Sequence, residues 1–467
     1  MLNLELINIV DACGGMVYLP EGKTIEEYSN KRPEGVVLDS REVKKDYIFV
    51  AYKGERVDGH DFIQQVIEKG ALAVICERIP KEIVCPCIKV DDSLKALTDI
   101  ASYYREKMDI ITVGIVGSVG KTSTKEMVAG VLSQKYKVLK GLGNHNNLLG
   151  LSLEILRLTS DIDMAVLEMG ISDFGEMKRL AKLVRPNTVV FTNIGECHLE
   201  FLGDRDGVLK AKTECFEYMD PKGYVVLNGL DDKLASIGEV HSKKPLRCGA
   251  KGQDVWAEDV KVSGVYGSTF TMNINIGDKE RKKVHICMPG AHMVGNALEA
   301  AAVGKIYGLT LDEIAKGIEQ TKALPGRSNV IDTGRYLLID DCYNANGASM
   351  RAAIDLLSTA NGRKVAILGD MYELGERSDE IHRETGEYAV SKGIEVLACV
   401  GANSKSMYEA AMGSLMCEMQ SVSYFETVEE LKKRLPSMLE ESDTILIKAS
   451  HGMNFAAVVD FLRELNK

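Results

Sequence analysis

The sequence predicts an α/β protein of three domains, and three observations lead to this class. The chain has 467 residues, more than one hydrophobic core usually accommodates. Short apolar runs that end in glycine recur through its middle, as expected of buried parallel strands whose carboxyl ends face a ligand. In the last third, strand-like and helix-like segments alternate regularly, which is typical of a doubly wound sheet.

The first two domains differ in their apolar patterns. Residues 1–105 contain the runs GVVLDS, DYIFVAY and ALAVICE between glycines and charged residues, and they predict a small N-terminal α/β domain. Residues 106–326 contain ITVGIVG, MAVLEMG and NTVVFTNIG, which predict the parallel strands of a central sheet. The later run GSTFTMNINIG alternates with period two, so an antiparallel patch is expected to follow them.

Residues 327–467 predict a C-terminal, Rossmann-like doubly wound domain. Proline and glycine in ALPGRSN, residues 323–329, predict a hinge before it. The expected strands are YLLIDD, KVAILGD, IEVLACVG and DTILIKAS, and the expected helices are 348–360, 378–392 and 427–440. No G-x-G-x-x-G motif is present here, so the sequence does not support a dinucleotide cofactor.

Composition narrows the class of protein. Hydrophobic residues make up 45% and charged residues 27%, as in ordinary globular proteins, and the net charge of −11 argues against nonspecific nucleic-acid binding. The 11 cysteines form no C-x-x-C pair and are expected to be reduced thiols. The N-terminal segment lacks signal-peptide features, and no apolar run approaches the about 18 residues of a membrane span. We therefore expect a cytoplasmic protein with no membrane span.

The segment VGIVGSVGKTSTKEMV, residues 113–128, predicts a phosphate-binding loop (P-loop) between a strand and a helix. The first glycine of the Walker pattern G-x-x-x-x-G-K-[ST] is absent, because Ile115 stands in its place. The backbone N–H groups of 118–122 are nevertheless expected to face one concavity at the positive end of the helix. Lys121 would contact the β- and γ-phosphates, and Thr122 would offer its hydroxyl to Mg²⁺. The segment expected to bind ATP consists of Gly117, Ser118, Val119, Gly120, Lys121, Thr122 and Ser123.

Polar residues also follow the strands expected beside this loop. Glu168 lies in MAVLEMG, and His198 comes shortly after NTVVFTNIG. Because the carboxyl ends of parallel strands share one crevice, these side chains could complete the coordination of a Mg²⁺ held by Thr122. Histidine is an unusual ligand for so hard an ion, and ordinary loop residues are the alternative. Lys210 and Lys212, on an expected helix, are either a solvated face or counter-charges for phosphate.

Sequence blocks along essentially the whole chain resemble the Mur ligase family. The first domain contributes DSREVKKDYIFVAYKGERVDGHDF, which resembles the family's uridine-binding region. The central domain contributes GSVGKTSTKE, GNHNNLLG, LEMGISDFGEM, HLEFLG, AKTE, GAHMVGNALEA and the PGR of the hinge. The last domain contributes DDCYNANGASM and LGDMYELG, which with the GN-x-NN-x-x-G block resemble one branch of the family. The blocks are specific together, although no single one would be.

The resemblance implies roles for individual residues. It places Asp39, Ser40 and Arg41 near the UDP end of the substrate. It implies that Asn296, Arg327 and Asp341 contact the nucleotide. Further substrate contacts are implied for Asn144, Asn146, Asn147, Asn344 and Asn346.

The reaction implied for this branch is ATP-dependent ligation in cytoplasmic peptidoglycan precursor synthesis. ATP phosphorylates the terminal carboxylate of a UDP-N-acetylmuramoyl-tripeptide, and the amine of D-alanyl-D-alanine attacks the acyl phosphate. Lys121, His198 and Lys212 are the implied catalytic residues. The implied cofactors are two Mg²⁺ ions bound by Thr122, Glu168, His198 and an N-carbamylated Lys212. A monomer is expected, and whether the third peptide residue is L-lysine or meso-diaminopimelate stays open.

The sequence departs from the family pattern at three positions. Gly347 replaces the proline usual after NAN, and Ala449 and His451 stand where glycine and arginine are common. Two relatives remain as alternatives, the ligase that adds the third residue and folylpolyglutamate synthase, although YNAN instead of a His-Asn-Pro form argues against the former. A catalytically inactive nucleotide-binding scaffold and a P-loop switch or kinase are the alternatives from other classes.

Overall fold

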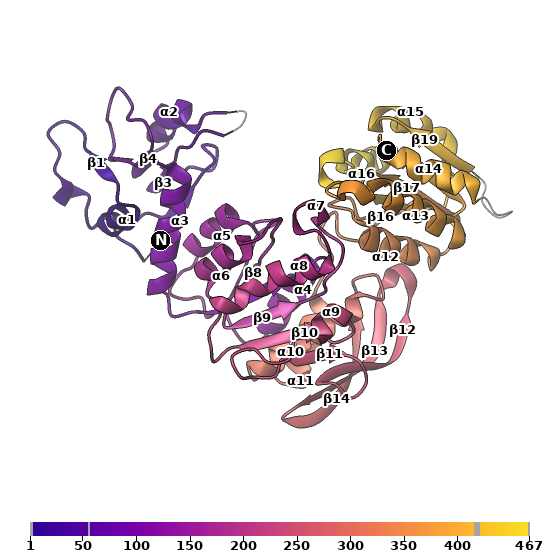
Figure 1. The fold of residues 1–467 in the computed structure, drawn as a ribbon. Coiled ribbons are helices and arrows are strands. Elements are labelled where there is room, and N and C mark those ends of the chain that lie inside the picture. Colours follow the sequence, from indigo (N-terminus) through magenta and orange to yellow (C-terminus); the bar gives the residue numbers. More distant parts are fainter. Residues whose placement is uncertain (1–2, 55–56, 415–420, 466–467) are drawn as a thin grey trace.

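The computed structural model describes residues 3–54, 57–414 and 421–465, and their strands form three sheets of five, nine and six strands (Figure 1). The five-stranded sheet lies in the indigo N-terminal part, the nine-stranded sheet in the middle of the chain, and the six-stranded sheet in the orange and yellow C-terminal part. Helices accompany every sheet, which confirms the predicted α/β class. No helix in the described ranges is long and apolar enough to cross a membrane.

The N-terminal sheet has the order β1-β5-β4-β3-β2, with β1 antiparallel to β5 and the other neighbours parallel. The runs predicted from sequence supply β2, β3 and β4, whereas the short strands β1 and β5, which pair with each other, were not predicted. The strands are β1 (Met16–Tyr18), β2 (Gly35–Val37), β3 (Tyr47–Val50), β4 (Ala73–Cys76) and β5 (Cys87–Lys89). The helices are α1 (Leu6–Cys13), α2 (Ile63–Glu68) and α3 (Ser93–Lys107).

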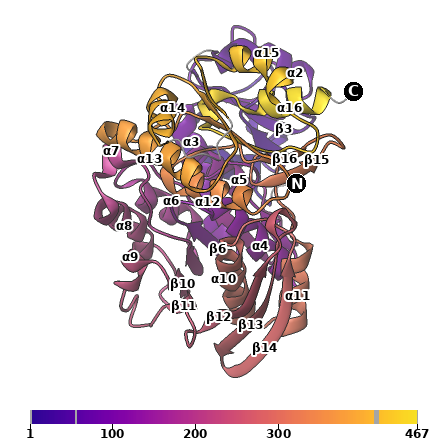
Figure 2. The same cartoon turned by 90° about the vertical axis from the view of Figure 1, so that its right-hand side faces the viewer.

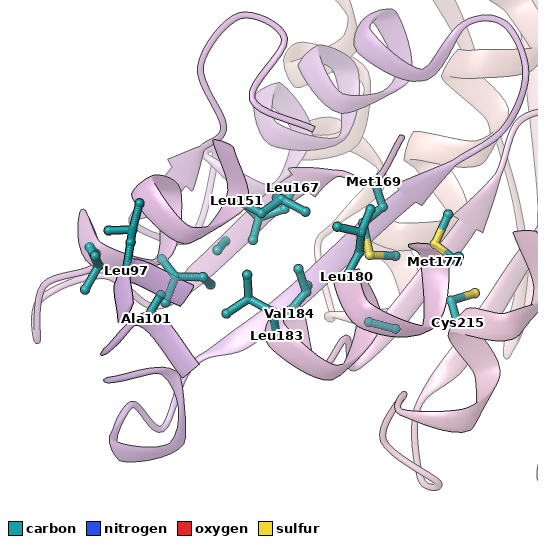
Figure 3. Packing of buried hydrophobic residues seen from close by; sticks show 14 of the residues in the cluster. Leu97, Ala101, Leu151, Leu167, Met169, Met177, Leu180, Leu183, Val184 and Cys215 are labelled. Carbon is teal, nitrogen blue, oxygen red and sulfur yellow. The ribbon is translucent and has the colours of Figure 1, made fainter. Parts of the chain in front are cut away.

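Helix α3 joins the N-terminal sheet to the central domain. Asp92 caps its N-terminal end, because the carboxylate accepts hydrogen bonds from N–H groups of the first turn. Its buried residues Leu97 and Ala101 face the helices α5 and α6 of the central domain, as Figure 3 shows. The buried Tyr104 donates its hydroxyl to the carbonyl of Leu158 at 2.6 Å. A shared core therefore connects the two parts through a helix, and the domain boundary expected at residue 105, inside α3, stays a prediction.

The central sheet has the order β14-β13-β12-β11-β10-β9-β6-β8-β7. Strand β6, which precedes the P-loop segment, lies between β8 and β9, and all three are parallel. The first six strands are β6 (Ile111–Val116), β7 (Val138–Lys140), β8 (Met164–Glu168), β9 (Thr188–Phe191), β10 (Tyr224–Asn228) and β11 (Leu246–Gly249). The carboxyl ends of β6, β8 and β9 thus meet at one edge, as the sequence predicts.

An antiparallel extension widens this sheet. It consists of β12 (Val255–Val262), β13 (Ser268–Ile276) and β14 (Asp278–Ile286), and β13 coincides with the period-two run GSTFTMNINIG. Figure 2 shows the three strands side by side at the bottom of the molecule. Their inward residues pack against α10, so the antiparallel patch extends the core beneath the P-loop helix.

Helices cover both faces of the central sheet. They are α4 (Lys121–Leu132), α5 (Leu148–Leu156), α6 (Glu176–Val184), α7 (Leu199–Leu202), α8 (Arg205–Thr213), α9 (Asp232–Ala235), α10 (Met293–Ile306) and α11 (Leu311–Gln320). The apolar residues Met127, Val128, Val131 and Leu132 of α4 are fully buried. Thr124 and Lys125 are buried as well, because α10 and α11 pack against α4 and enclose it on more than its apolar face.

The C-terminal sheet has the order β15-β16-β20-β17-β18-β19, parallel except for the β15–β16 pair. Its strands are β15 (Asn329–Asp332), β16 (Leu337–Asp340), β17 (Lys364–Gly369), β18 (Val396–Val400), β19 (Ser421–Phe425) and β20 (Thr444–Lys448). Its helices are α12 (Gly347–Ser358), α13 (Ser378–Ser391), α14 (Ser404–Gly413), α15 (Val428–Met438) and α16 (Ala456–Glu464). The four predicted strands and three predicted helices are present, whereas β15, β19, α14 and α16 were not predicted.

Candidate nucleotide and metal site

The P-loop segment connects β6 to α4 through two glycines whose conformations other residues rarely adopt. Gly117 has φ 152°, and a Cβ there would lie 2.0 Å from the hydroxyl of Thr192. Gly120 has φ 83° and precedes α4 without any side-chain cap. The first N–H groups of the helix are therefore left for a ligand. Ile115, which replaces the first Walker glycine, is a buried residue of β6, where no glycine is required.

A residue not singled out from the sequence holds this loop in shape. Asn193, just after β9, accepts a hydrogen bond from the N–H of Val119 at 3.0 Å and donates its amide to the Val119 carbonyl at 2.9 Å. The N–H of Ser118 donates to the Asn193 carbonyl at 3.0 Å. The expectation that all the N–H groups of 118–122 face the concavity is therefore too broad, because two of them bind Asn193.

Lys121 lies over the loop that precedes it. Its amine donates to the carbonyls of Gly117 at 3.0 Å and Ser118 at 3.3 Å. Both carbonyls belong to the same loop, so the amine can exchange them for a phosphate without the loss of a contact in the apolar core. Asn296 of α10 lies on the other side of the loop, because a Cβ on Gly120 would be 3.4 Å from its side-chain oxygen. The structure thus brings Lys121 and Asn296, two of the residues predicted to contact the nucleotide, to the P-loop.

Thr122 and Glu168 meet at the edge where β6 and β8 end. The hydroxyl of Thr122 donates to one carboxylate oxygen of Glu168 at 2.8 Å, and the amide of Asn146 donates to the other at 2.9 Å. Burial, the largest influence, would raise the pKa of Glu168, but the charge of Lys121 and the Asn146 hydrogen bond lower it overall. Glu168 is therefore a buried carboxylate held in its ionised form.

These donors fit a magnesium ion better than a soft metal. Throughout the described ranges, no three His, Cys, Asp or Glu side chains come together as a complete metal site. Mg²⁺ commonly takes only one or two carboxylates and completes its shell with waters and substrate phosphates. The hydroxyl of Thr122, in the first turn of α4, and the ionised carboxylate of Glu168, at the end of β8, are oxygen ligands of this type.

Lys212 is fully enclosed, unlike its neighbour Lys210. It lies on α8 with 1% of its surface exposed, and no hydrogen bond to its amine is present among the described residues. Burial, the largest cause, lowers the pKa of Lys212 to about 8; the charge of Lys121 acts in the same direction, and Cys197 and Glu168 oppose it. Lys210 is exposed, with its amine 5.8 Å from the ring centre of Phe174. The two lysines therefore face different surroundings, and Lys212 lies close to the Lys121 and Glu168 pair.

His198 sits in a loop rather than directly at a strand end. Its φ is 52°, and it precedes α7. Its Nδ1 lies 2.7 Å from a carboxylate oxygen of Glu373 in the C-terminal domain, but the two atoms are not aligned for a hydrogen bond, and this buried nitrogen makes none among the described residues. Burial is the largest cause that lowers the pKa of His198, and the cations Lys212 and Lys121 add to it while Glu373 opposes it. His198 is therefore a neutral imidazole near both lysines.

The asparagines of the GNHNN block have separate environments. Asn146 orients Glu168, whereas Asn147 caps α5 by accepting the N–H of Gly150 at 2.9 Å. Asn144 lies near Tyr343 of the C-terminal domain. The buried Lys125 of α4 anchors the start of this segment, because its amine donates to the carbonyl of Gly141 at 2.7 Å. This anchor was missed from the sequence, where a lysine inside a helix carries no signal of burial.

The hinge and the YNAN segment contact each other near Glu168. The guanidinium of Arg327 lies 3.7 Å from the ring centre of Tyr343, and its charge acts on Glu168. Asp341 accepts the N–H of Ser328 at 2.8 Å and pairs with the buried Lys448 at 2.5 Å. These contacts place Arg327 beside the site and give Asp341 a role in holding the hinge.

The remaining predicted substrate residues are further apart. Asn346 caps α12 by accepting the N–H of Ser349 at 2.9 Å, and the backbone carbonyl of Asn344 accepts the amine of Lys448 at 2.9 Å. Ser40 and Arg41 follow β2 in the N-terminal sheet, and Arg41 pairs with Asp39 at 2.5 Å. Ser40 and Arg41 therefore lie in a different domain from the P-loop.

The departures from the family pattern are accommodated locally. Gly347 begins α12 close to Ile381, from which a Cβ at this position would lie 2.9 Å. Ala449 is fully buried beside Gly369. His451 has its ring centre 5.3 Å from that of Tyr343, so it extends the Arg327–Tyr343 stack in place of the usual arginine.

Comparison with known proteins places this architecture in one family. Three family models match the chain: the Mur ligase family, catalytic domain at residues 33–105, the Mur ligase middle domain at 115–304, and the Mur ligase, glutamate ligase domain at 326–451. The chain is 36% identical over 438 residues to the UDP-N-acetylmuramoyl-tripeptide--D-alanyl-D-alanine ligase of Escherichia coli (strain K12), which covers 92% of this chain and 94% of that one.

Solved structures agree with these matches. MurF from Acinetobacter baumannii has a TM-score of 0.85 and 31% identity, with 98% of both chains covered. MurF ligase from Thermotoga maritima in complex with ADP has a TM-score of 0.78 and 28% identity, with 92% of this chain and 97% of that chain covered. The chain described here belongs to the Mur ligase family.

Proposed function

We propose that this chain is an ATP-dependent ligase that joins D-alanyl-D-alanine to a UDP-N-acetylmuramoyl-tripeptide. The observation that carries the proposal is the match to a ligase of that name over nearly the whole length of both chains. The site has the parts such a reaction needs, because Lys121, Thr122 and Glu168 converge at the first turn of α4. The related MurF ligase from Thermotoga maritima was solved in complex with ADP, which supports ATP as the nucleotide.

The chemistry explains why a phosphate-binding site serves an amide ligase. A carboxylate does not react with an amine, because oxide is too poor a leaving group. Transfer of the γ-phosphoryl group to the tripeptide carboxylate makes an acyl phosphate, and attack by the amine then expels phosphate. The N–H groups at the start of α4 and the Lys121 ammonium stabilise the charge that develops on the transferred group.

Thr122 and Glu168 would hold Mg²⁺ beside the phosphates. Bound there with ATP, Mg²⁺ supplies positive charge that neutralises the phosphate oxygens. Asn146 keeps Glu168 oriented through its amide, and the neutral His198 lies close by. Arg327, stacked on Tyr343, would meet the nucleotide from the hinge, and Asn296 would meet it beside the P-loop.

Lys212 would act as a carbamate rather than as an amine. A neutral amine adds CO₂ to form a carbamate and releases one proton, which turns a potential cation into an anionic oxygen ligand. A pKa of about 8 leaves roughly a fifth of the amines neutral at pH 7.4. The enclosed side chain faces Lys121 and Glu168, so a carbamate there could help to bind a second Mg²⁺.

The proposal also covers the cellular compartment, the oligomeric state and the placement of the substrate. The ten described cysteines are all free, which is consistent with a reducing cytoplasm, where the UDP-linked precursor would be made. We infer a monomer, with the substrate's UDP end bound near Ser40 and Arg41 of the N-terminal sheet and its peptide near Asn144 and Asn344.

The test is product formation with defined substrates. The purified protein, ATP, Mg²⁺ and a UDP-N-acetylmuramoyl-tripeptide should release phosphate only when D-alanyl-D-alanine is added, and mass spectrometry should find the pentapeptide. Tripeptides that end in L-lysine and in meso-diaminopimelate identify the preferred third residue. Phosphate release with a dipeptide substrate and a free third amino acid, or with a folate and glutamate, would instead favour the related ligases. Nucleotide binding without any product would favour an inactive scaffold.

A further inference from the structure

One contact between domains involves His198, a predicted ligand of the candidate metal site. A turn at residues 373–377 of the C-terminal domain touches residues 196–200, the segment that contains His198. Figures 1 and 2 both show α7, which follows His198, beside the C-terminal domain. The turn makes two polar contacts with this segment: the Glu373 carboxylate lies 2.7 Å from the ring of His198, and Arg377 forms an ion pair with Glu196 at 2.5 Å.

The two residues of the first contact have an uncommon backbone conformation. Glu373 has φ 62° and His198 has φ 52°, both in the left-handed region that residues other than glycine rarely occupy. Their surroundings hold them there. The N–H of Tyr372 donates to the hydroxyl of Ser450 at 2.9 Å, and the carbonyl of His198 accepts the N–H of Leu202 at 3.0 Å. Two strained residues thus face each other across the domain junction.

The contact favours one tautomer of His198. The Glu373 carboxylate lies 2.7 Å from Nδ1, a buried nitrogen that makes no hydrogen bond within the described ranges. A proton on Nδ1 would be stabilised by this carboxylate and would leave the lone pair on Nε2. In metal sites, a carboxylate on the second ring nitrogen orients a histidine ligand, and its loss typically weakens metal binding by about 10- to 100-fold.

We propose that Glu373 is a positioning residue, which orients His198 for the nucleotide-bound metal ion from a different domain. The inference rests on the proposed function, because it assumes that His198 faces this metal site. His198 is then correctly oriented only while the C-terminal domain is docked on the central one. Metal binding and domain docking are coupled as a result, each favouring the other.

Arg377, on the same turn, offers a matched control that separates domain docking from orientation of His198. Arg377 lies on the same turn and holds the same segment through Glu196, but its contacts are with Glu196 and Glu380 rather than with His198. If Glu373 only helps to dock the domains, Arg377→Ala and Glu373→Ala should have the same effect. If Glu373 orients His198, only the latter should change metal affinity.

The experiment measures metal binding rather than turnover. Free Mn²⁺ is titrated by electron paramagnetic resonance in the presence of protein and ADP, for wild type, Glu373→Ala, Glu373→Gln and Arg377→Ala. We expect Glu373→Ala to weaken Mn²⁺ binding by about 10-fold or more. Glu373→Gln, whose amide oxygen can still accept the Nδ1 proton, should stay within about 3-fold of wild type, and Arg377→Ala within about 2-fold.

Several results would overturn the inference. They are unchanged Mn²⁺ affinity in Glu373→Ala, equal losses in Glu373→Ala and Arg377→Ala, and a loss in Glu373→Gln as large as in the alanine variant. A second measurement needs no variant of Glu373: ¹⁵N spectra of histidine-labelled protein, with His198→Gln for assignment, should show His198 protonated on Nδ1. A proton on Nε2 would contradict the proposal. Failure of the wild type to bind Mn²⁺ with ADP would instead contradict the proposed function itself.

Discussion

Replacing Lys212 by alanine tests the most unusual feature of the site. The pKa of this lysine falls from 10.5 to about 8, which corresponds to about 3 kcal/mol against the charged amine in its enclosed position. The folded protein therefore disfavours a cation here, and a carbamate near Lys121 would remove the cation. If the carbamate binds metal, Lys212→Ala should lower kcat by about 100-fold or more, as for the loss of one group that stabilises the transition state.

The assay is phosphate release with saturating ATP, tripeptide and D-alanyl-D-alanine. Acetate or formate should restore part of the activity of Lys212→Ala, because a small carboxylate can occupy the vacated anionic position. Lys210→Ala is the matched control and should lose less than about 3-fold, since Lys210 is exposed on another side of α8. The reasoning is refuted if Lys212→Arg keeps substantial activity and added carboxylates do not help Lys212→Ala. That pattern would mean that a cation at this position touches phosphate.

Three other predictions follow from the same contacts. Lys121→Ala should fold normally, because the Lys121 amine donates to loop carbonyls, and it should lose about 3 kcal/mol or more of transition-state stabilisation. Near-normal kcat/KM in a folded variant would contradict the P-loop assignment. Arg327→Ala should raise the KM for ATP more than it lowers kcat, since the guanidinium stacks on Tyr343 beside Glu168, whereas a lower Tm with unchanged ATP dependence would indicate a structural arginine. Burial raises the pKa of Glu299 well above its usual value, and a hydrogen bond from Thr124 opposes this shift more weakly. The protonated side chain therefore contributes to the free energy of unfolding below the unfolded-state pKa. This contribution is lost as pH rises through the folded-state pKa. Glu299→Gln should lack this loss, and urea midpoints that change in parallel with pH for both proteins would contradict it.

The sequence predicted the parts of the fold that depend on local pattern. The runs around Ile115, Glu168 and Val190 are apolar, end in polar or glycine residues, and form the neighbouring strands β6, β8 and β9. Because parallel strands place their carboxyl ends at one edge, the proximity of Thr122 to Glu168 could be expected before the structure was seen. The short strands β1 and β5 have too few residues for a clear period, and they were missed.

Contacts between distant residues could not be read from the sequence. The bond from Val119 to Asn193 joins positions 74 residues apart, and it removes N–H groups that local reasoning assigned to the ligand. The contact of His198 with Glu373 depends on how one domain docks on another, which no periodicity encodes. Burial of Lys125 was also hidden, because a lysine on a helix is usually a surface residue. The resemblance of the sequence blocks indicated which residues lie at the site, and the structure showed which contacts hold them in place.

Isotope transfer tests the central claim most directly. The claim is that the tripeptide carboxylate attacks the γ-phosphoryl group of ATP to form an acyl phosphate. The amine of D-alanyl-D-alanine then attacks the acyl carbon and displaces phosphate. A UDP-N-acetylmuramoyl-tripeptide with ¹⁸O in its terminal carboxylate is incubated with the protein, ATP, Mg²⁺ and D-alanyl-D-alanine, and the released phosphate is analysed by mass spectrometry. The account predicts one ¹⁸O atom in each phosphate formed with a pentapeptide. Phosphate without ¹⁸O, or release that does not require the dipeptide, would contradict it.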